Sequence, residues 1–141
     1  MHTNDANGWL QTRPGERCFI RVPANQTGGV YSAVEITSEP GDATPLHCHA
    51  NEDEHLMVLE GIAKVAVGGQ VFCAKVGEAV RLPRHVPHAW GNRSSKLLRM
   101  VVVAMPGGVE EALRIIAAGD FRVIPMVAQR FGVTNLGPPP F

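Results

Sequence analysis

The amino-acid sequence predicts an all-β domain, a sandwich or barrel of short strands, with one or two short α-helices near its C-terminus. Short apolar stretches recur about every 8 to 12 residues through the first hundred positions, which is the strand spacing of such folds. The 15 glycines and 11 prolines are spread between these stretches as turn residues. After residue 108 the apolar residues change to helical spacing. The 141 residues are the usual length of a single domain.

Alternation and turn signals define the expected strands. The first clear strand covers residues 30–37, with Val30, Val34 and Ile36 on one face and a Pro-Gly turn after it. The Gly68-Gly69 pair separates two apolar runs and predicts a two-residue hairpin. The further expected strands cover residues 56–59, 62–67, 71–74, 79–82, 88–90 and 97–103.

Two helices are expected after the barrel. The first begins at Val109, carries two glutamates in its first turn and ends at Gly119. The second covers residues 125–131, with Pro125 at its first position and Gly132 just past its end. We expect both helices to cover a sheet face or form a subunit contact. The tail, residues 136–141, contains three consecutive prolines and predicts an extended strap.

The charge balance disfavours several classes of partner. Thirteen basic and thirteen acidic residues give zero formal net charge, whereas nucleic-acid binders are usually basic and membrane-surface segments carry charge blocks. The longest apolar run, residues 100–105, is too short to span a bilayer, and the first eight residues lack a secretory signal. We therefore expect a cytoplasmic protein that binds a small molecule. The low charged fraction, 18%, favours self-association.

The three cysteines indicate no disulfide framework. Cys18, Cys48 and Cys73 are an odd number at wide spacings, without a CxxC pair. We expect three buried or half-buried thiols.

Histidine is concentrated in one region, with five of the six histidines between positions 47 and 88. On a strand, His47 and His49 leave the same face about 6 to 7 Å apart and converge on one ion. Glu54 follows five residues later, and His88 directly precedes another apolar strand. Three imidazoles and one carboxylate form a ligand set for one divalent transition metal: Fe, Ni, Mn, Zn, Co or Cu. On an octahedral ion, four protein ligands leave two positions open.

These residues match the two sequence motifs of the cupin superfamily, and the chain resembles the small, single-domain, quercetin-dioxygenase-like cupins. The first motif is matched at every spacing by Gly41, His47, His49, Glu54 and Gly61, and the second by Gly77, Pro83, His88 and Asn92. The resemblance implies a double-stranded jelly-roll barrel that forms half of a homodimer. Residues 1–141 then form one cupin domain, with an N-terminal arm and first strand in 1–29, the barrel in 30–104, and helices and tail in 105–141.

The resemblance transfers the metal ligands of the family to His47, His49, Glu54 and His88. Asp53 is the alternative carboxylate, but the spacing to Gly61 selects Glu54. His85 stands where the second motif usually has glycine. Because histidine is among the few other residues tolerated at positive φ, the turn is expected to survive. The His85 imidazole is then either a group near the metal or an exposed turn residue.

Inward-facing neighbours of the ligands are candidates for a substrate pocket. Leu56 and Val58 follow Glu54 on its strand face, and Trp90 follows His88. These side chains either line an apolar pocket or fill a small barrel. Asn92, at the second motif, either orders its loop or contacts the substrate. His55 faces away from the site, and neither it nor His2 is expected to take part in it.

The predicted function is that of a metal-dependent oxidoreductase of the dioxygenase type. Glu54 is both a ligand and the candidate catalytic base, and the apolar pocket predicts a small apolar or aromatic enolisable substrate. Cupins of this kind also include isomerases and binding proteins, so the fold alone does not define the reaction. A non-enzymatic module that binds metal or a small ligand, and an isomerase or epimerase, remain the alternatives.

Overall fold

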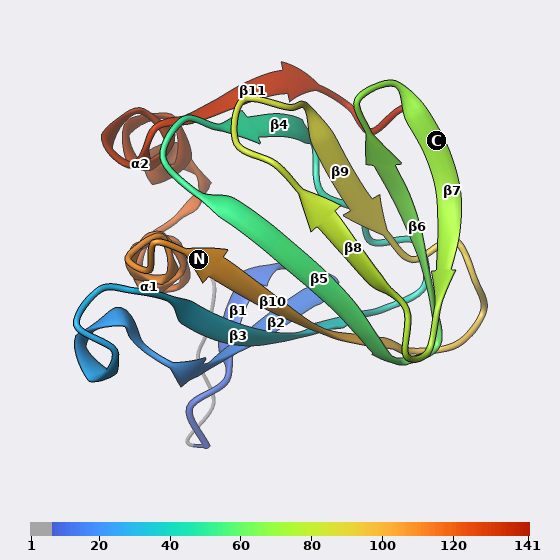
Figure 1. Ribbon diagram of the computed structural model, residues 1–141, viewed down its shortest axis with the longest axis horizontal. Helices are drawn as coiled ribbons and strands as arrows, with labels where there is room; N and C mark the ends of the chain where they lie inside the picture. The colour runs from blue at the N-terminus through green and yellow to red at the C-terminus, as the bar shows by residue number, and fades with distance from the viewer. Residues whose placement is uncertain (1–6) are drawn as a thin grey trace.

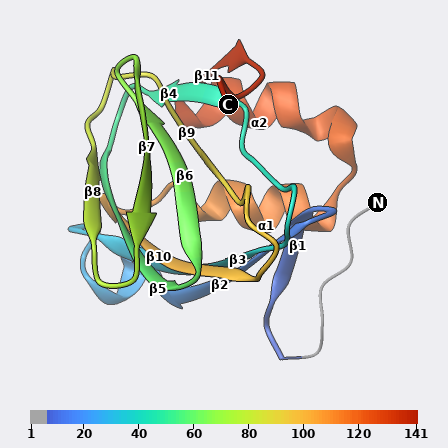
Figure 2. The same cartoon turned by 90° about the vertical axis from the view of Figure 1, so that its right-hand side faces the viewer.

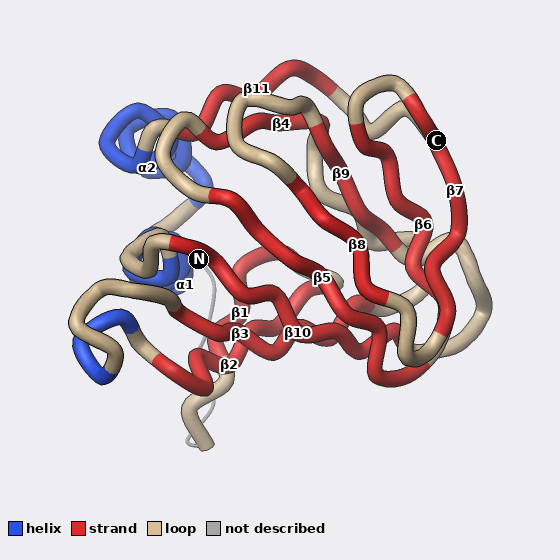
Figure 3. The backbone as a smooth tube through the Cα atoms, in the orientation of Figure 1, coloured by secondary structure: helices blue, strands red, loops and turns tan. Residues whose placement is uncertain are grey.

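Two antiparallel sheets face each other and enclose the core, as the predicted jelly-roll barrel requires (Figures 1 and 3). The structure, a computed structural model, describes residues 7–141. His2 and the first six positions of the expected N-terminal arm lie outside the described residues. No helix among the described residues is long and apolar enough to cross a membrane.

The two sheets contain six and five strands. The larger sheet has the order β1-β2-β3-β10-β5-β8, formed by Leu10–Arg13, Glu16–Val22, Ser32–Ser38, Leu98–Met105, Asp53–Glu60 and Ala79–Leu82. The smaller sheet has the order β11-β4-β9-β6-β7, formed by Val133–Gly137, Leu46–His49, His88–Gly91, Ile62–Val67 and Gln70–Lys75. Most neighbours are distant in sequence, so the fold depends on long-range pairing.

Alternation along the strands builds the core between the sheets. On β5 the side chains of Leu56 and Val58 are buried, whereas Met57 and Leu59 on the opposite face are exposed. The same alternation on β10 buries Leu98, Met100 and Val102, among others. Because strand side chains repeat with period two, one face of each strand supplies the core and the other faces outward.

Two helices cover one side of the barrel. The helices α1 (Glu110–Ala118) and α2 (Ile124–Phe131) connect β10 in one sheet to β11 in the other. Helix α1 packs against β1 and α2 against β11, on the side of the barrel away from β7 and β8 (Figure 2). Short 3-10 helices at Ala24–Gln26 and Phe121–Val123 complete the described elements.

Several expected elements are present. The hairpin between β6 and β7 turns at Gly68 and Gly69, which have φ angles of 56° and 86°, as a type I′ turn requires. Helix α1 ends at Gly119 as predicted. Helix α2 has Pro125 in its first turn and ends at Gly132, whose φ of 70° is left-handed. The expected homodimer stays a prediction.

Three details of the sequence-based prediction were wrong. Val30 is 68% exposed and precedes β3, because its N–H bonds to Thr27 in the preceding turn. Part of the expected strap belongs to β11, which pairs with β4. The Cys73 thiol is exposed because its strand, β7, is at the edge of its sheet.

Glu110 attaches the start of α1 to the barrel. Its carboxylate is 1% exposed and accepts backbone N–H bonds from Ala24 at 2.8 Å and Gly108 at 2.7 Å. Burial opposes ionisation, but these hydrogen bonds outweigh it and lower the pKa of Glu110 below its ordinary 4.5. The ionised carboxylate therefore stabilises the folded state.

We expect Glu110→Gln to lower the free energy of unfolding by about 1–3 kcal/mol at pH 7, because charge-assisted hydrogen bonds are replaced by weaker ones. A folded-state pKa below the unfolded one contributes stability above pH 4.5, and this stability is lost as the pH falls through the folded-state value. Urea denaturation at pH 7 and at pH 3.5–4 measures both effects. Glu111→Gln, an exposed neighbour, is the control, and equal losses in the two variants would contradict the assignment.

Candidate metal centre

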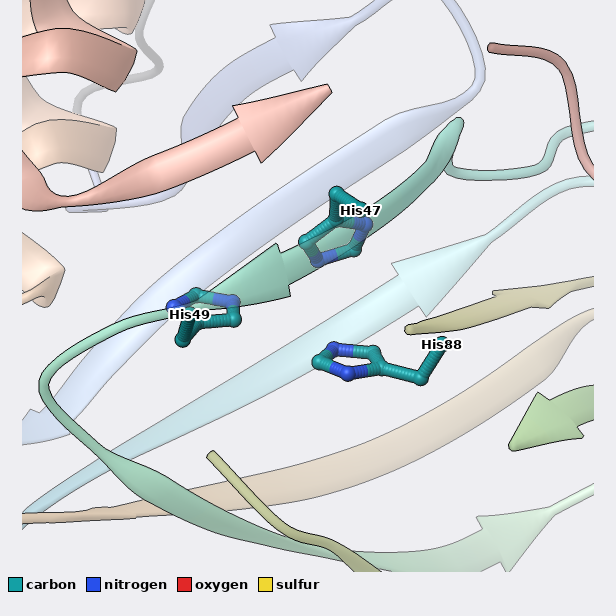
Figure 4. A group of neighbouring side chains, drawn as sticks. All are labelled: His47, His49 and His88. Carbon is teal, nitrogen blue, oxygen red and sulfur yellow. The ribbon is translucent and has the colours of Figure 1, made fainter. Parts of the chain in front are cut away.

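Three histidines from the smaller sheet point into one space between the sheets (Figure 4). His47 and His49 lie on β4, and His88 begins β9. His47 pairs directly with His88 across the two strands. The candidate ligand atoms of the three residues all lie within 4.8 Å of one another. The spacing of the two β4 histidines therefore places them as predicted, on one face beside His88.

The same nitrogen of each imidazole is turned away from this shared space. Nδ1 of His47 lies 2.8 Å from the Pro45 carbonyl, and Nδ1 of His88 lies 3.4 Å from the Val86 carbonyl. Nδ1 of His49 lies 2.5 Å from a carboxylate oxygen of Glu52. Because carbonyl and carboxylate oxygens accept, each neutral ring carries its hydrogen on Nδ1. The Nε2 lone pairs are then available to a metal.

Glu54 reaches the same space from the opposite sheet. It lies on β5 and is 5% exposed. Its Oε1 atom is 3.4 Å from Nε2 of His49 and 3.4 Å from Nε2 of His88. Asp53, the alternative carboxylate, instead pairs with Arg84 on the outside of the barrel.

Burial and neighbouring charges set the protonation of these groups. Burial and the nearby His88 lower the pKa of His47 from 6.5 to about 4, so this imidazole is neutral at pH 7. Burial also opposes protonation of His49, but Glu52 and Glu54 outweigh it and raise the pKa of His49. Burial opposes ionisation of Glu54, but the nearby imidazoles, His88 first, lower the pKa of this carboxyl in net.

The residues fit a divalent transition metal. Ligand atoms about 2.1 Å from an ion are separated by about 3.0–3.4 Å from each other, which is the separation of the Glu54 oxygen from its two imidazole neighbours. Oε1 of Glu54 and Nε2 of His88 are buried without a hydrogen-bond partner. Buried polar atoms are normally satisfied, and one ion among these groups would satisfy both.

Glu52 is a site residue that the sequence reasoning missed. It was not among the candidate site residues, but Glu52 is 5% exposed and bonds His49. A carboxylate on the second nitrogen of an imidazole fixes its orientation and strengthens it as a ligand. The available signal was the two-residue spacing of Glu52 and Glu54: Glu52 directly precedes β5, and extended backbone there places both side chains on the same side of the chain.

An apolar cavity of about 260 Å³ adjoins the imidazoles of His47 and His49 and the carboxylate of Glu54. It lies between the barrel and the two C-terminal helices. Its apolar walls include Ile36 and Val102 from the larger sheet, Trp90 from β9, and Leu113 and Phe131 from the helices. The helices were expected to cover a sheet or form a subunit contact, and they also form one wall of this cavity.

Charged residues at the cavity wall near β1 and β2 are paired with one another. Arg13 bonds Glu16 at 2.6 Å and Asp42 at 3.0 Å. The Thr12 hydroxyl donates to Glu16 at 2.6 Å. These bonds hold the β1–β2 hairpin against the loop before β4, and they commit the charges at this wall to internal partners.

The remaining candidate pocket residues have separate places. Leu56 and Val58 lie in the hydrophobic core and not among the residues that line the cavity, which favours the alternative of barrel filling. The amide of Asn92 bonds the carbonyls of Ser38 and Lys96, so it orders its loop.

The His85 side chain is exposed, and its φ of 65° makes it the one non-glycine residue at positive φ among those described. Its N–H bonds the carbonyl of His49. The turn thus survives the replacement of glycine as expected.

The chain belongs to the cupin family. The family model of the cupin domain matches residues 34–104, about half of the chain. The matched region contains all three histidines and Glu54.

Comparison with known proteins gives relatives of several activities. Quercetin 2,3-dioxygenase of Bacillus subtilis is 29% identical over 114 residues, which cover 76% of this chain and 34% of the relative. The chain thus spans about a third or less of the length of the curated relatives it matches. A sugar phosphate isomerase of Silicibacter pomeroyi has a TM-score of 0.59 at 20% identity, with 67% of this chain and 62% of that chain covered. The polyketide cyclase RemF of Streptomyces resistomycificus has a TM-score of 0.62 at 21% identity, with 74% and 79% covered. The two structural likenesses show the fold alone.

We expect His49→Ala to lose bound metal, because it removes one of the clustered imidazoles. The loss of affinity should be at least the roughly 10–100-fold that removal of an outer partner costs. Elemental analysis of protein purified without an affinity tag, with competition by a chelator, measures it. His55→Ala is the matched control, since His55 is exposed on the opposite face of β5. Equal metal content in both variants and the wild type would refute the assignment.

Replacing Glu52 should weaken the site without removing a ligand. We expect Glu52→Gln to lower zinc affinity by about 10–100-fold, because the amide supports the His49 ring less strongly than a carboxylate. Asp53→Asn, at the adjacent outward-facing position, should keep the wild-type affinity. Calorimetric zinc titration of the three proteins tests this, and equal affinities for Glu52→Gln and wild type would show that Glu52 does not support the ligand.

Proposed function

We propose that this protein is a metal-dependent oxidoreductase of the dioxygenase type, acting on a small apolar or aromatic enolisable substrate. The observation that carries the proposal is the convergence of three imidazoles and one carboxylate beside an apolar cavity. His47, His49, Glu54 and His88 would hold one divalent transition metal through Nε2 and carboxylate oxygen atoms. The sequence similarity to quercetin 2,3-dioxygenase supports this choice among cupin activities.

The cavity walls favour an apolar or aromatic substrate. The surfaces from both helices and the larger sheet are mostly aliphatic or aromatic, and Arg13 and Glu16 are bonded internally. A sugar substrate carries many hydroxyl groups, and burying them without hydrogen-bond partners costs free energy. A flat molecule with its oxygen atoms at one end meets no such penalty, because those atoms face the polar end of the cavity.

Glu54 is the proposed catalytic base. When bound, a transition metal supplies Lewis acidity and electron transfer in this class of reaction. The carboxylate of Glu54, once loosened from the ion, would accept the proton from the substrate hydroxyl and leave the enolate or phenolate. The apolar walls exclude water from the oxygen end of the substrate.

Two other functions have support from the fold. The structural similarity to a sugar phosphate isomerase keeps an isomerase or epimerase as an alternative. A non-enzymatic module that binds metal or a small ligand would use the same donor set. These alternatives predict different measurements from those of the proposed dioxygenase.

Oxygen uptake tests the proposal. The iron-loaded and nickel-loaded protein should consume oxygen with quercetin or another enolisable aromatic compound. Glu54→Gln should slow the uptake by at least about 100-fold, because it removes a positioned base. Glu60→Gln, an exposed position at the end of the same strand, should retain it.

Two results would contradict the proposal. The absence of uptake with any such compound would exclude the dioxygenase reaction for these substrates and favour a binding module. Interconversion of sugar phosphates without oxygen uptake would favour the isomerase.

A further inference from the structure

Asn135 is a polar residue of the cavity wall that is accessible and is not a proposed metal ligand. It lies on β11 and is exposed. Apart from the proposed ligands, the other polar or charged side chains of this wall among the described residues are buried or half-buried: Thr12, Arg13, Glu16, Ser32, Thr44 and Glu110. A molecule that enters the cavity can therefore reach Asn135 without displacing a protein group.

Strand pairing directs the Asn135 side chain to the side of the proposed ligands. Strand β11 lies beside β4 (Figure 1), with Asn135 directly opposite His47 and Val133 opposite His49. Opposite residues of an antiparallel pair point to the same face, with Cβ atoms about 4.5–5.5 Å apart. In agreement, Val133 and Asn135 line the cavity, whereas Thr134 between them does not. The Asn135 amide therefore lies next to the imidazole of His47.

The oxygen of the Asn135 amide is occupied, and its nitrogen is not. Oδ1 accepts the backbone N–H of Gly137 at 2.9 Å. Because a backbone N–H requires an acceptor, this bond defines which of the two amide atoms is the oxygen. The Nδ2 atom has no hydrogen-bond partner among the described residues. Asn135 therefore offers two N–H donors on an amide that the turn at the end of β11 orients.

The cavity wall offers no unpaired cation to an anionic substrate group. Arg13 is the basic residue among those that line the cavity, and its guanidinium bonds Glu16 at 2.6 Å and Asp42 at 3.0 Å. A carboxylate that left water for this wall would lose hydration without gaining a free ionic partner. A neutral carbonyl oxygen has a smaller desolvation cost, and the neutral amide of Asn135 can donate to it.

We propose that the Asn135 amide nitrogen donates a hydrogen bond to a carbonyl oxygen of the substrate, next to the hydroxyl oxygen that faces the metal ligands. Asn135 is then a specificity-determining residue, and this role rests on the proposed function. The favoured substrates are flat enolisable compounds with a hydroxyl and a carbonyl on adjacent carbons. An analogue with the hydroxyl but without the carbonyl lacks this bond and binds more weakly.

Two probes separate the proposed hydrogen bond from shape. The zinc-loaded protein is redox-inactive, so binding can be measured by fluorescence titration without turnover. 3-Hydroxyflavone carries both oxygens, whereas 3-phenyl-2-naphthol, of similar shape, has the hydroxyl but no carbonyl. Asn135→Ala should lower the affinity for 3-hydroxyflavone roughly 3- to 10-fold, because one hydrogen bond is lost. The affinity for 3-phenyl-2-naphthol should fall much less.

Two further variants control for the turn and for the strand. Asn135→Asp keeps an oxygen for the Gly137 N–H but removes the donor, so it should weaken 3-hydroxyflavone binding at least as much as Asn135→Ala. Thr134→Ala changes an exposed residue on the opposite face of β11, and it should match the wild type for both probes. Equal zinc content in all proteins excludes an indirect effect through the ion.

Nuclear magnetic resonance observes the donor directly. In the ¹⁵N-labelled, zinc-loaded protein, Asn135→Ala assigns the side-chain amide signals of Asn135. On saturation with 3-hydroxyflavone, one of its two amide protons should move downfield and exchange more slowly with solvent. The side-chain amide of Asn25, which is exposed and does not line the cavity, is the internal control and should stay in place.

The outcomes distinguish this inference from the proposed function. The role of Asn135 would be overturned by any of three results: absence of 3-hydroxyflavone binding, unmoved Asn135 amide signals with this probe bound, or an equal effect of Asn135→Ala on both probes. Oxygen uptake by the iron-loaded or nickel-loaded protein would still support the dioxygenase in these cases. A shifted signal and selective weakening, without oxygen uptake, would support the role of Asn135 and contradict the dioxygenase.

Discussion

The pairing of β4 with β9 is the contact on which the rest of the site depends. It brings His47 directly opposite His88, and the period of the strand then places His49 on the same face. The opposing sheet contributes Glu54 through β5, whose neighbour β10 lies at the centre of that sheet. A one-residue slip of any of these strands would turn its ligand outward. The buried hydrophobic faces of both sheets resist such a slip, so core packing also maintains the site.

Charge explains why this constellation suits a divalent cation. Glu52 and Glu54 are both nearly inaccessible to solvent, and burial of ionised carboxylates is costly unless they are compensated. The hydrogen bond between Glu52 and His49, and the closeness of Glu54 to the imidazoles of His49 and His88, provide part of this compensation. A cation between the Nε2 atoms would neutralise the two negative charges. It would also bind Oε1 of Glu54 and Nε2 of His88, which lack hydrogen-bond partners. The polar end of the cavity and its apolar walls thus follow from different requirements, ion binding and exclusion of water.

Local sequence signals predicted the features that depend on local geometry. The Gly68-Gly69 turn, the end of α2 at Gly132 and the positive φ at His85 follow from backbone sterics. The motif spacing predicted that the three histidines and Glu54 lie close together. The strand β11 was missed because its pairing with β4 links residues more than eighty positions apart, and it is short and at a sheet edge. The burial of Glu52 and the cavity wall formed by α1 and α2 depend on tertiary packing, which no local pattern reports.

The connections of the C-terminal helices to both sheets constrain how molecules enter and leave the cavity. Helices α1 and α2 are tethered at both ends, by β10 in one sheet and β11 in the other. Such a segment cannot swing away on a single hinge. Passage past it requires transient separation of α1 from β1 or of α2 from β11, a local opening whose free energy is set by those contacts. The residence time of a molecule bound in the cavity therefore depends on the local stability of this helical segment, independently of the affinity of that molecule for the ion.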